Sequence, residues 1–456
     1  MSGFTFQRER ERERERETID KNFTSTRITK IFPSSASLEM PKEKGTQTTT
    51  SSSAGSFLRA FLFAIILASF AQQVVFVIFQ RRERSSTTRP RLKTKHSRTD
   101  IKMQILQPRT SKVTQNEVIV GLSSLAGLYA KMEEKHAIDV VHCALDLGFR
   151  NFDTAPHYGL GLSEERFGKA LKSYPKMTED LREEIKIWTK VGRVIKDKND
   201  VSETDRVEEG NVLGHPDCVF PENNPESRPT LNYTGDGVAQ SLTDSLERIG
   251  VKHIFGIRVH DCEDEIRFKE AANKDTGAFV RIKRMRDEEK VVEDVSLGGN
   301  DPMYSLRAIR ESAENTFDGV MAAGSWNLID QDGCELYKEC EKRGMYIHNA
   351  GIYASGLLVG GSTYKYGPAN ENVIAKKKAW EQLCEEFGNI SLPAVAMAFS
   401  AAPNVVKKFA VGVKSRFEVE KTLEWLNEID NIDPKIWEEA KLRGLLSSDC
   451  TVPNVF

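Results

Sequence analysis

Short β-branched segments alternate with helical segments from about residue 116 to the C-terminus, and this alternation restricts the fold more than any other feature of the chain. The eight strand candidates are VIVGLSS (118–124), FRNFD (149–153), IKIWTKVG (185–192), HIFGIRVHD (253–261), VVEDVSLGG (291–299), FDGVMAAG (317–324), MYIHNAG (345–351) and KFAVGV (408–413). Helical segments lie between them, and two of these end at Gly148 and Gly250, as helices commonly do. Strict alternation of this kind implies a parallel sheet.

Eight strand–helix units predict an α/β fold with a (β/α)8 TIM barrel. A doubly wound sheet is the rival fold, but it would carry a glycine-rich fingerprint directly after its first strand. The glycine-rich stretch of this chain, YGLGLSEE, follows the second strand and does not match GxGxxG, and no P-loop pattern occurs. The barrel is therefore the predicted fold.

The first 115 residues differ in composition from the barrel region. RERERERERE and TQTTTSSSAGS predict a disordered low-complexity tail over residues 1–59. Residues 60–79 form an uncharged hydrophobic segment whose twenty residues match the length of one membrane-spanning helix. A basic linker is assigned to residues 80–115, and the barrel domain to residues 116–456.

The hydrophobic segment 60–79 has three interpretations. Arginine and lysine are more frequent after it than before it, so a single-pass anchor would make membrane contact there and leave the barrel facing the cytoplasm. A cleaved signal for an organelle or the secretory route is the alternative, because LASFA offers small residues near a possible cleavage site. The third is that the N-terminal residues are not part of the working protein. The sequence favours the anchor.

Residues 194–233 interrupt the regular spacing after the third strand. A long loop inside a compact domain is often functional. In a barrel, a loop that follows a strand lies on the face that carries the active site. We therefore predict an insertion at 194–233 that covers the active site as a lid, with a remote surface elaboration as the alternative.

Four polar residues end predicted strands or follow them closely on one face of the barrel: Asp153, Tyr158, Lys190 and His260. Each alone has an ordinary explanation as a cap, a turn or an exposed side chain. Polar groups at the carboxyl ends of barrel strands, taken together, predict an active site.

The chemistry of this set is coherent. A free phenol titrates at about pH 10, so Tyr158 relays a proton at neutral pH only if a cation such as Lys190 stabilises its anion. Asp153 would balance the buried lysine, and a neutral His260 would hydrogen-bond the substrate oxygen. The set can move a proton to or from an alcohol or carbonyl oxygen but holds no electron sink, so hydride chemistry needs a cofactor.

Four segments together resemble the aldo-keto reductase superfamily: GFRNFDTAPHYGLGLSEERFGKAL, IWTKVGR, SLERIGVKHIFGIRVHD and AVGVKSRFEVEKTLEWL. Within it, the chain is most similar to D-threo-aldose 1-dehydrogenase, L-fucose dehydrogenase and L-galactose dehydrogenase. The resemblance covers about residues 116–453. It implies that Asp153, Tyr158, Lys190 and His260 are the catalytic tetrad, with Tyr158 as the acid/base.

The resemblance also implies a cofactor, NADP or NAD. It assigns Asn300 to the carboxamide, and Gly412, Lys414, Ser415 and Arg416 to the adenosine phosphate. The family frequently has a glutamine where this chain has Ala323, and a nicotinamide-stacking tyrosine where it has Ala350. Trp326 and Tyr353 are the candidate replacements for that tyrosine. No metal site is expected.

The predicted function is an NAD(P)-dependent oxidoreductase that oxidises an aldose at C1 to a lactone, or reduces a carbonyl in reverse. A general aldehyde or pyridoxal-type reductase is one alternative, and a non-catalytic cofactor-binding module similar to a channel β-subunit is another. The expected partner is a small sugar or aldehyde. The net charge of −2 argues against nucleic acid as a partner.

Overall fold

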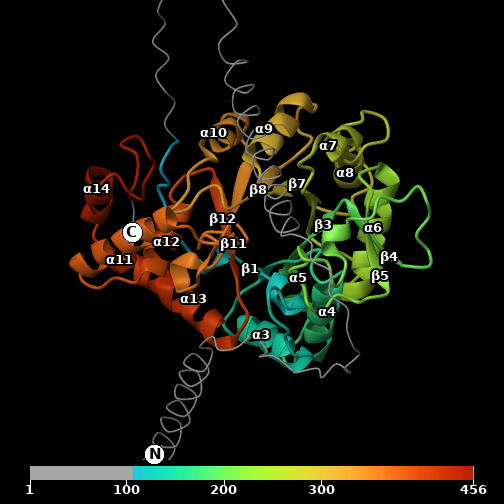
Figure 1. Cartoon of the computed structure of the whole chain (residues 1–456), viewed down its shortest axis with the longest axis horizontal. Helices are drawn as coiled ribbons and strands as arrows, with labels where there is room; N and C mark the ends of the chain where they lie inside the picture. The colour runs from blue at the N-terminus through green and yellow to red at the C-terminus, as the bar shows by residue number, and fades with distance from the viewer. Residues whose placement is uncertain (1–105, 455–456) are drawn as a thin grey trace, which may run out of the picture. The chain divides into compact units, whose positions relative to one another are not determined.

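Eight parallel strands close into a barrel at the centre of this computed structural model, which describes residues 106–454 (Figure 1). The barrel strands are β1 (Val118–Gly121), β2 (Asn151–Asp153), β3 (Lys186–Val191), β6 (Gly256–His260), β7 (Asp294–Gly299), β8 (Gly319–Ala323), β9 (Tyr346–Ala350) and β12 (Val406–Gly412). Their order around the barrel is β1-β12-β9-β8-β7-β6-β3-β2, and β2 pairs with β1 to close it. The predicted (β/α)8 barrel is confirmed, and its eight strands are those expected from the sequence, with ends shifted by a few residues.

Helices surround the barrel. They are α3 (Glu134–Asp146), α4 (Leu162–Ser173), α5 (Glu179–Glu184), α6 (Gly235–Ile249), α7 (Glu265–Ala271), α8 (Ala278–Asp287), α9 (Pro302–Glu311), α10 (Cys334–Arg343), α11 (Glu371–Glu386), α12 (Leu392–Ala401), α13 (Arg416–Glu428) and α14 (Lys435–Leu442). Short 3-10 turns occur at η1 (Gln115–Glu117), η2 (Ser123–Ala126), η3 (Glu209–Asn211), η4 (Leu357–Val359) and η5 (Ile429–Asn431). The end of α6 illustrates the sequence signal, because Gly250 adopts a left-handed φ of 72° there.

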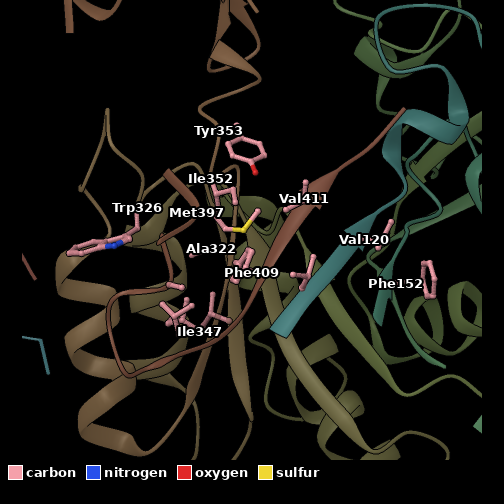
Figure 2. Close-up of a cluster of buried hydrophobic side chains, with 14 of the residues drawn as sticks. Val120, Phe152, Ala322, Trp326, Ile347, Ile352, Tyr353, Met397, Phe409 and Val411 are labelled. Carbon is pink, nitrogen blue, oxygen red and sulfur yellow. The ribbon is translucent and has the colours of Figure 1, made fainter. Parts of the chain in front are cut away.

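The hydrophobic core lies between the strands and the helices (Figure 2). Phe152 in β2 packs on Phe167 of α4, with ring centroids 5.1 Å apart. Because successive side chains of a strand point to opposite faces, the next residue, Asp153, points into the barrel. The strands thus present apolar residues to the helices, while positions that face the barrel interior can carry polar residues such as Asp153.

The insertion 194–233 contains a β-hairpin rather than a loop without regular structure. Strands β4 (Arg193–Asp197) and β5 (Ser227–Leu231) pair antiparallel outside the barrel. The hairpin follows β3 after Gly192, which adopts a φ of 117° against the ring of Tyr233. This close approach and backbone angle suit only glycine, and they turn the chain out of the barrel at the end of the strand that carries Lys190.

A second small hairpin follows β9 and consists of β10 (Thr363–Tyr364) and β11 (Gly367–Pro368). Its two turn residues, Lys365 and Tyr366, have φ values of 45° and 65°. Two consecutive left-handed residues are the geometry of a type I′ turn, which joins paired strands tightly. The side chain of Tyr364 ties the hairpin to the loop after β8 by donating to Asp330 at 3.0 Å.

The sequence predicted a membrane anchor at residues 60–79 with the barrel facing the cytoplasm, and this prediction is corrected. Between residues 106 and 454 no helix is both long and apolar enough to span a bilayer. Even α11 has only 16 residues and several charges, whereas a span needs about 20 largely apolar residues. Residues 60–79 lie outside the described residues. The transmembrane assignment, the membrane contact and the orientation derived from them are withdrawn.

Candidate active site

Lys190 connects three groups at the carboxyl end of β2 and β3. Its ammonium forms an ion pair with Asp153 and donates to the Thr154 carbonyl at 2.8 Å and to the Tyr158 hydroxyl at 3.0 Å. An ammonium has three protons, so all three are used. Because the Tyr158 oxygen accepts from Lys190, the tyrosine's own O–H proton is directed elsewhere and can be donated.

Burial and charge act in opposite directions on this pair. Burial raises the pKa of Tyr158 above its ordinary value, while the Lys190 ammonium lowers it, and the net direction is upward. For Lys190, burial lowers the pKa, but the Asp153 carboxylate and Tyr158 raise it, and the net direction is again upward. At neutral pH the phenol is therefore protonated and the lysine charged.

Asp153 is held from a second side by Arg258, which lies in β6. The Arg258 guanidinium donates to Asp153 at 3.0 Å and to Ser296 at 2.7 Å. It also contacts Nδ1 of His348 at 2.9 Å. This network fills the barrel interior beneath Tyr158, and its charges and hydrogen bonds fix the Asp153 carboxylate that faces Lys190.

His260 ends β6 and lies beside Tyr158, with ring centroids 6.2 Å apart and planes at 87°. Its Nδ1 is 3.2 Å from Nη1 of Arg193, and its Nε2 is 3.4 Å from a carboxylate oxygen of Asp261. Burial lowers the pKa of His260 well below its ordinary value, and the Arg193 charge lowers it further. His260 is therefore neutral at physiological pH.

Asp261 has a strained backbone directly after His260. Its φ of 46° is left-handed, a conformation that costs energy for a residue with a Cβ. The Tyr233 hydroxyl donates to the His260 carbonyl at 2.5 Å, which holds the backbone at this turn. Strain that is maintained by specific contacts is typical of functional sites.

The insertion contributes side chains to the same cluster. Phe220 is buried, and its ring lies 6.2 Å from that of Tyr158 and 5.7 Å from that of His157. His157 in turn lies 5.8 Å from His260. Glu208 pairs with Arg193 through two contacts of 2.7 and 2.9 Å. The hairpin and its connection thus reach the tetrad instead of lying remote from it.

Asn300, assigned to the carboxamide, directly follows β7 and is exposed. Its side-chain oxygen accepts from the Tyr366 hydroxyl at 3.0 Å. Tyr366 is in the turn of the β10–β11 hairpin, and its hydroxyl lies within electrostatic reach of Tyr158 and Asp261. Asn300 is therefore near the tetrad, in contact with a tyrosine that sequence reasoning did not single out.

The residues assigned to the adenosine phosphate lie together at the end of β12 and the start of α13. Gly412 ends the strand, Ser415 caps the helix by accepting from the Glu418 amide at 3.2 Å, and Arg416 is its first residue. The Lys414 side chain is 72% exposed, so it can reach a ligand. A cation beside the amides of a helix start fits a phosphate, although Glu418 opposes it by accepting from the Lys414 amide at 2.7 Å.

Both candidates for the nicotinamide-stacking ring are buried side chains. Trp326 is buried among helices, where it stacks on Phe399 at 5.6 Å and on Tyr337 at 5.3 Å (Figure 2). Tyr353 is also buried and packs edge-on against Trp425 of α13 at 5.8 Å (Figure 2). Both rings are therefore covered by other aromatic side chains, and their role as replacements for the nicotinamide-stacking tyrosine stays a prediction.

The four predicted catalytic residues lie close together. Asp153, Tyr158, Lys190 and His260 form one contact network. Sequence reasoning missed the residues that support them: Arg193, Glu208, Phe220, Arg258 and Tyr366. One signal could have found Arg258, because it lies two residues before His260 in the same strand and so shares its inward face.

Comparison with known proteins finds one family model and several similar proteins. The model of the aldo/keto reductase family matches residues 117–441. The chain is 28% identical over 339 residues to pyridoxal 4-dehydrogenase of Microbacterium luteolum, covering 72% of this chain and 94% of that one. It is 28% identical over 298 residues to D-threo-aldose 1-dehydrogenase of a Pseudomonas species, covering 64% and 83%. It is 22% identical over 312 residues to L-galactose dehydrogenase of Arabidopsis thaliana, covering 68% and 84%.

Two solved structures have the same fold. The holo form of an aldo-keto reductase, AKR11C1 of Bacillus halodurans, aligns with a TM-score of 0.52 at 19% identity, over 75% of this chain and 97% of that one. Glycerol dehydrogenase AKR11B4 of Gluconobacter oxydans aligns with a TM-score of 0.51 at 17% identity, over 77% and 98%. At these identities the likeness concerns the fold alone.

Proposed function

The chain belongs to the aldo/keto reductase family of oxidoreductases, and from this premise we propose that it is an NAD(P)-dependent dehydrogenase that oxidises an aldose at C1 to a lactone. The observation that supports this best is the hydrogen bond from Lys190 to Tyr158 at 3.0 Å. Because the Tyr158 oxygen accepts this hydrogen bond, its own proton points away from Lys190. There the phenol can exchange the proton with a substrate oxygen. Two of the relatives are named for aldose substrates, which favours a sugar.

Proton transfer is the part of the reaction that this chain's own residues perform. During oxidation the Tyr158 phenolate, which the Lys190 ammonium stabilises, accepts the proton of the C1 hydroxyl and becomes the neutral phenol. Asp153, held by Arg258, keeps Lys190 charged and in place. His260 donates a hydrogen bond to the same substrate oxygen and so fixes its position. In the reverse direction Tyr158 is the acid.

The cofactor supplies the hydride acceptor when it is bound. Lys414, Ser415 and Arg416 would hold its adenosine phosphate, with Gly412 allowing close approach, and Asn300 would hold its carboxamide. The exposed ammonium of Lys414 and the start of α13 suit an anion. Glu418 beside them weakens the case for an additional 2′-phosphate, so both NAD and NADP have to be tested.

A pyridoxal-type substrate is the second candidate, because the relative with 28% identity over 339 residues is a pyridoxal 4-dehydrogenase. An aldehyde of this type would place its oxygen between Tyr158 and His260 in the same way as the sugar. The ring of Phe220, next to Tyr158, is an aromatic neighbour for a flat substrate. The two candidates therefore share the proton-transfer residues and differ in what lies against the rest of the substrate.

Substrate screening with the full-length protein decides between them. L-galactose, an aldose of the D-threo series and pyridoxal are each tested with NAD and with NADP, and the fluorescence of the reduced nicotinamide is followed. The matched control is the methyl glycoside of the best sugar, which has no free C1 hydroxyl and should be inert. Turnover of pyridoxal but of no aldose would replace the first proposal with the second. Cofactor binding without turnover of any substrate would overturn both in favour of a binding module.

A further inference from the structure

Arg193 occupies a position behind His260 that determines where the histidine proton resides. We infer that Arg193, held by Glu208 of the insertion, fixes His260 in the tautomer protonated at Nε2 and is thus a positioning residue for the reaction. The catalytic part of this inference rests on the proposed function, whereas the tautomer itself does not.

The direction of the Arg193 contact follows from its chemistry. Nη1 of Arg193 lies 3.2 Å from Nδ1 of His260. A guanidinium stays charged, has donors and has no acceptor. Nδ1 must therefore be the unprotonated, accepting nitrogen, and in a neutral imidazole the proton must then be on Nε2.

The groups around His260 agree with that assignment. The charged and titratable neighbours that act on it are Arg193, Lys190, His157, Arg267 and Asp261. Three of these are cations, which oppose a positive charge on the imidazole. The one acceptor among the close contacts is a carboxylate oxygen of Asp261, 3.4 Å from Nε2, on the side where the assigned proton is. An Nε2–H group is also the donor that a substrate oxygen beside Tyr158 requires.

Glu208 fixes the orientation of the Arg193 guanidinium. It accepts from Nε at 2.7 Å and from Nη2 at 2.9 Å, which is the paired geometry that a guanidinium and a carboxylate favour. Nη1 then remains for His260 and for Asp261, whose oxygen is 3.0 Å away. The Arg193 side chain is only 4% exposed, so water does not compete for these donors. The insertion thus acts on the histidine through a single carboxylate.

Nitrogen NMR of the imidazole tests the tautomer without any substrate. The full-length protein is labelled with ¹⁵N, and the His260 signals are assigned as those absent from the His260→Gln spectrum. We expect Nδ1 to have the shift of an unprotonated nitrogen and Nε2 that of a protonated one at neutral pH. In Arg193→Met, we expect both nitrogen shifts to move towards the average of the two tautomers. In Arg193→Lys, we expect shifts between those of the wild-type protein and those of Arg193→Met.

Arg267→Met is the matched control, because Arg267 also pairs with Glu208, at 2.9 Å, but does not contact Nδ1. It should leave the tautomer unchanged. In kinetics, Arg193→Met should lower kcat about tenfold to a hundredfold with cofactor affinity unchanged, the scale on which such supporting partners act. A wild-type Nδ1 that carries the proton overturns the inference even if the variants do not fold. An unchanged kcat in Arg193→Met, with the tautomer altered, overturns only the positioning role and leaves the dehydrogenase proposal intact.

Discussion

At the scale of single residues, a substitution at Tyr158 distinguishes the chemical role of its hydroxyl, which accepts a hydrogen bond from Lys190, from the packing role of its ring. Tyr158→Phe keeps the ring against Phe220 and removes only the hydroxyl that accepts at 3.0 Å from Lys190. We expect kcat to fall by about 10²–10⁴-fold, the usual share of acid–base catalysis, with cofactor affinity nearly unchanged. Steady-state kinetics and a fluorescence titration measure the two quantities. A variant that keeps more than roughly a third of the wild-type rate would exclude Tyr158 as the acid/base.

The raised pKa of Tyr158 gives the two reaction directions opposite pH dependence. Burial raises the pKa of the phenol more than Lys190 lowers it. Oxidation needs the deprotonated form, so its rate should rise with pH up to the raised pKa of the phenol, while reduction needs the protonated form and its rate should fall as the pH passes that pKa. Lys190→Met, as control, should move the oxidation limb to still higher pH. Parallel profiles for both directions would contradict the assignment.

We propose that the charges at the start of α13, Lys414 and Glu418, influence the choice between NADP and NAD. Lys414→Ala should weaken the binding of NADP more than the binding of NAD, by about tenfold if the Lys414 ammonium contacts the 2′-phosphate. Glu418→Gln is the matched change of opposite sign, because it removes the carboxylate that accepts from the Lys414 amide. Glu418→Gln should therefore strengthen the binding of NADP relative to the binding of NAD. Calorimetric titration with both nucleotides measures this, and equal losses for both in Lys414→Ala would place its side chain away from the 2′-phosphate.

The common location of Asp153, Tyr158, Lys190 and His260 could be predicted because each stands at or after a strand end, where sequence and barrel geometry together locate the active face. Arg193 and Arg258 could not. Their partners, His260 and Asp153, are far away in sequence and become neighbours only when β2, β3 and β6 lie side by side in the barrel. A buried arginine inside a β-branched strand was nevertheless a signal, since such a charge needs a partner.

At the scale of elements, the eight barrel strands could be predicted because their β-branched runs are separated by helices with clear ends. The β4–β5 hairpin could not, because the two strands are short, widely separated, and one contains Pro229. Proline cannot donate to a sheet and argues against a strand except at an edge. In this hairpin Pro229 is paired with Ile195 of β4, and its carbonyl accepts from the Glu208 amide at 2.9 Å.

We propose that the hairpin connection, residues 198–226, is both a lid over the active site and a structural support. Replacing it by a short Gly/Ser turn keeps β4 and β5 but removes Glu208, Phe220 and Glu222, of which Glu222 pairs with Arg166 at 3.1 Å. We expect KM for the sugar to rise and stability to fall by at least about 3 kcal/mol, because a buried aromatic ring is lost. Glu222→Gln should lower the melting temperature without changing KM. Wild-type kinetics in the shortened protein would exclude the lid.

At the scale of the whole molecule, the part of the chain before β1 belongs partly to the barrel. Leu106 is buried, and its carbonyl accepts from Thr451 at 2.8 Å. The Arg109 amide donates to Ala402 at 2.8 Å, and its side chain pairs with Glu117 at 2.9 Å. A basic linker over 80–115 was the natural interpretation of the composition, because two of these partners, Thr451 and Ala402, lie far away in the sequence. We propose that the folded domain includes residues 106–115 and so begins before residue 116.

Truncation tests this boundary directly. The protein 106–456 should unfold at the temperature of the full-length protein and keep its activity, because a closed barrel pairs all of its own strands. The protein 116–456 should be less stable by about 2 kcal/mol or more, because it loses the burial of Leu106 and leaves Glu117 without Arg109. Leu106→Ala in the longer protein is the matched control and should reproduce part of that loss. Equal melting temperatures for both truncated proteins would show that residues 106–115 add no stability, and would restore the boundary at 116.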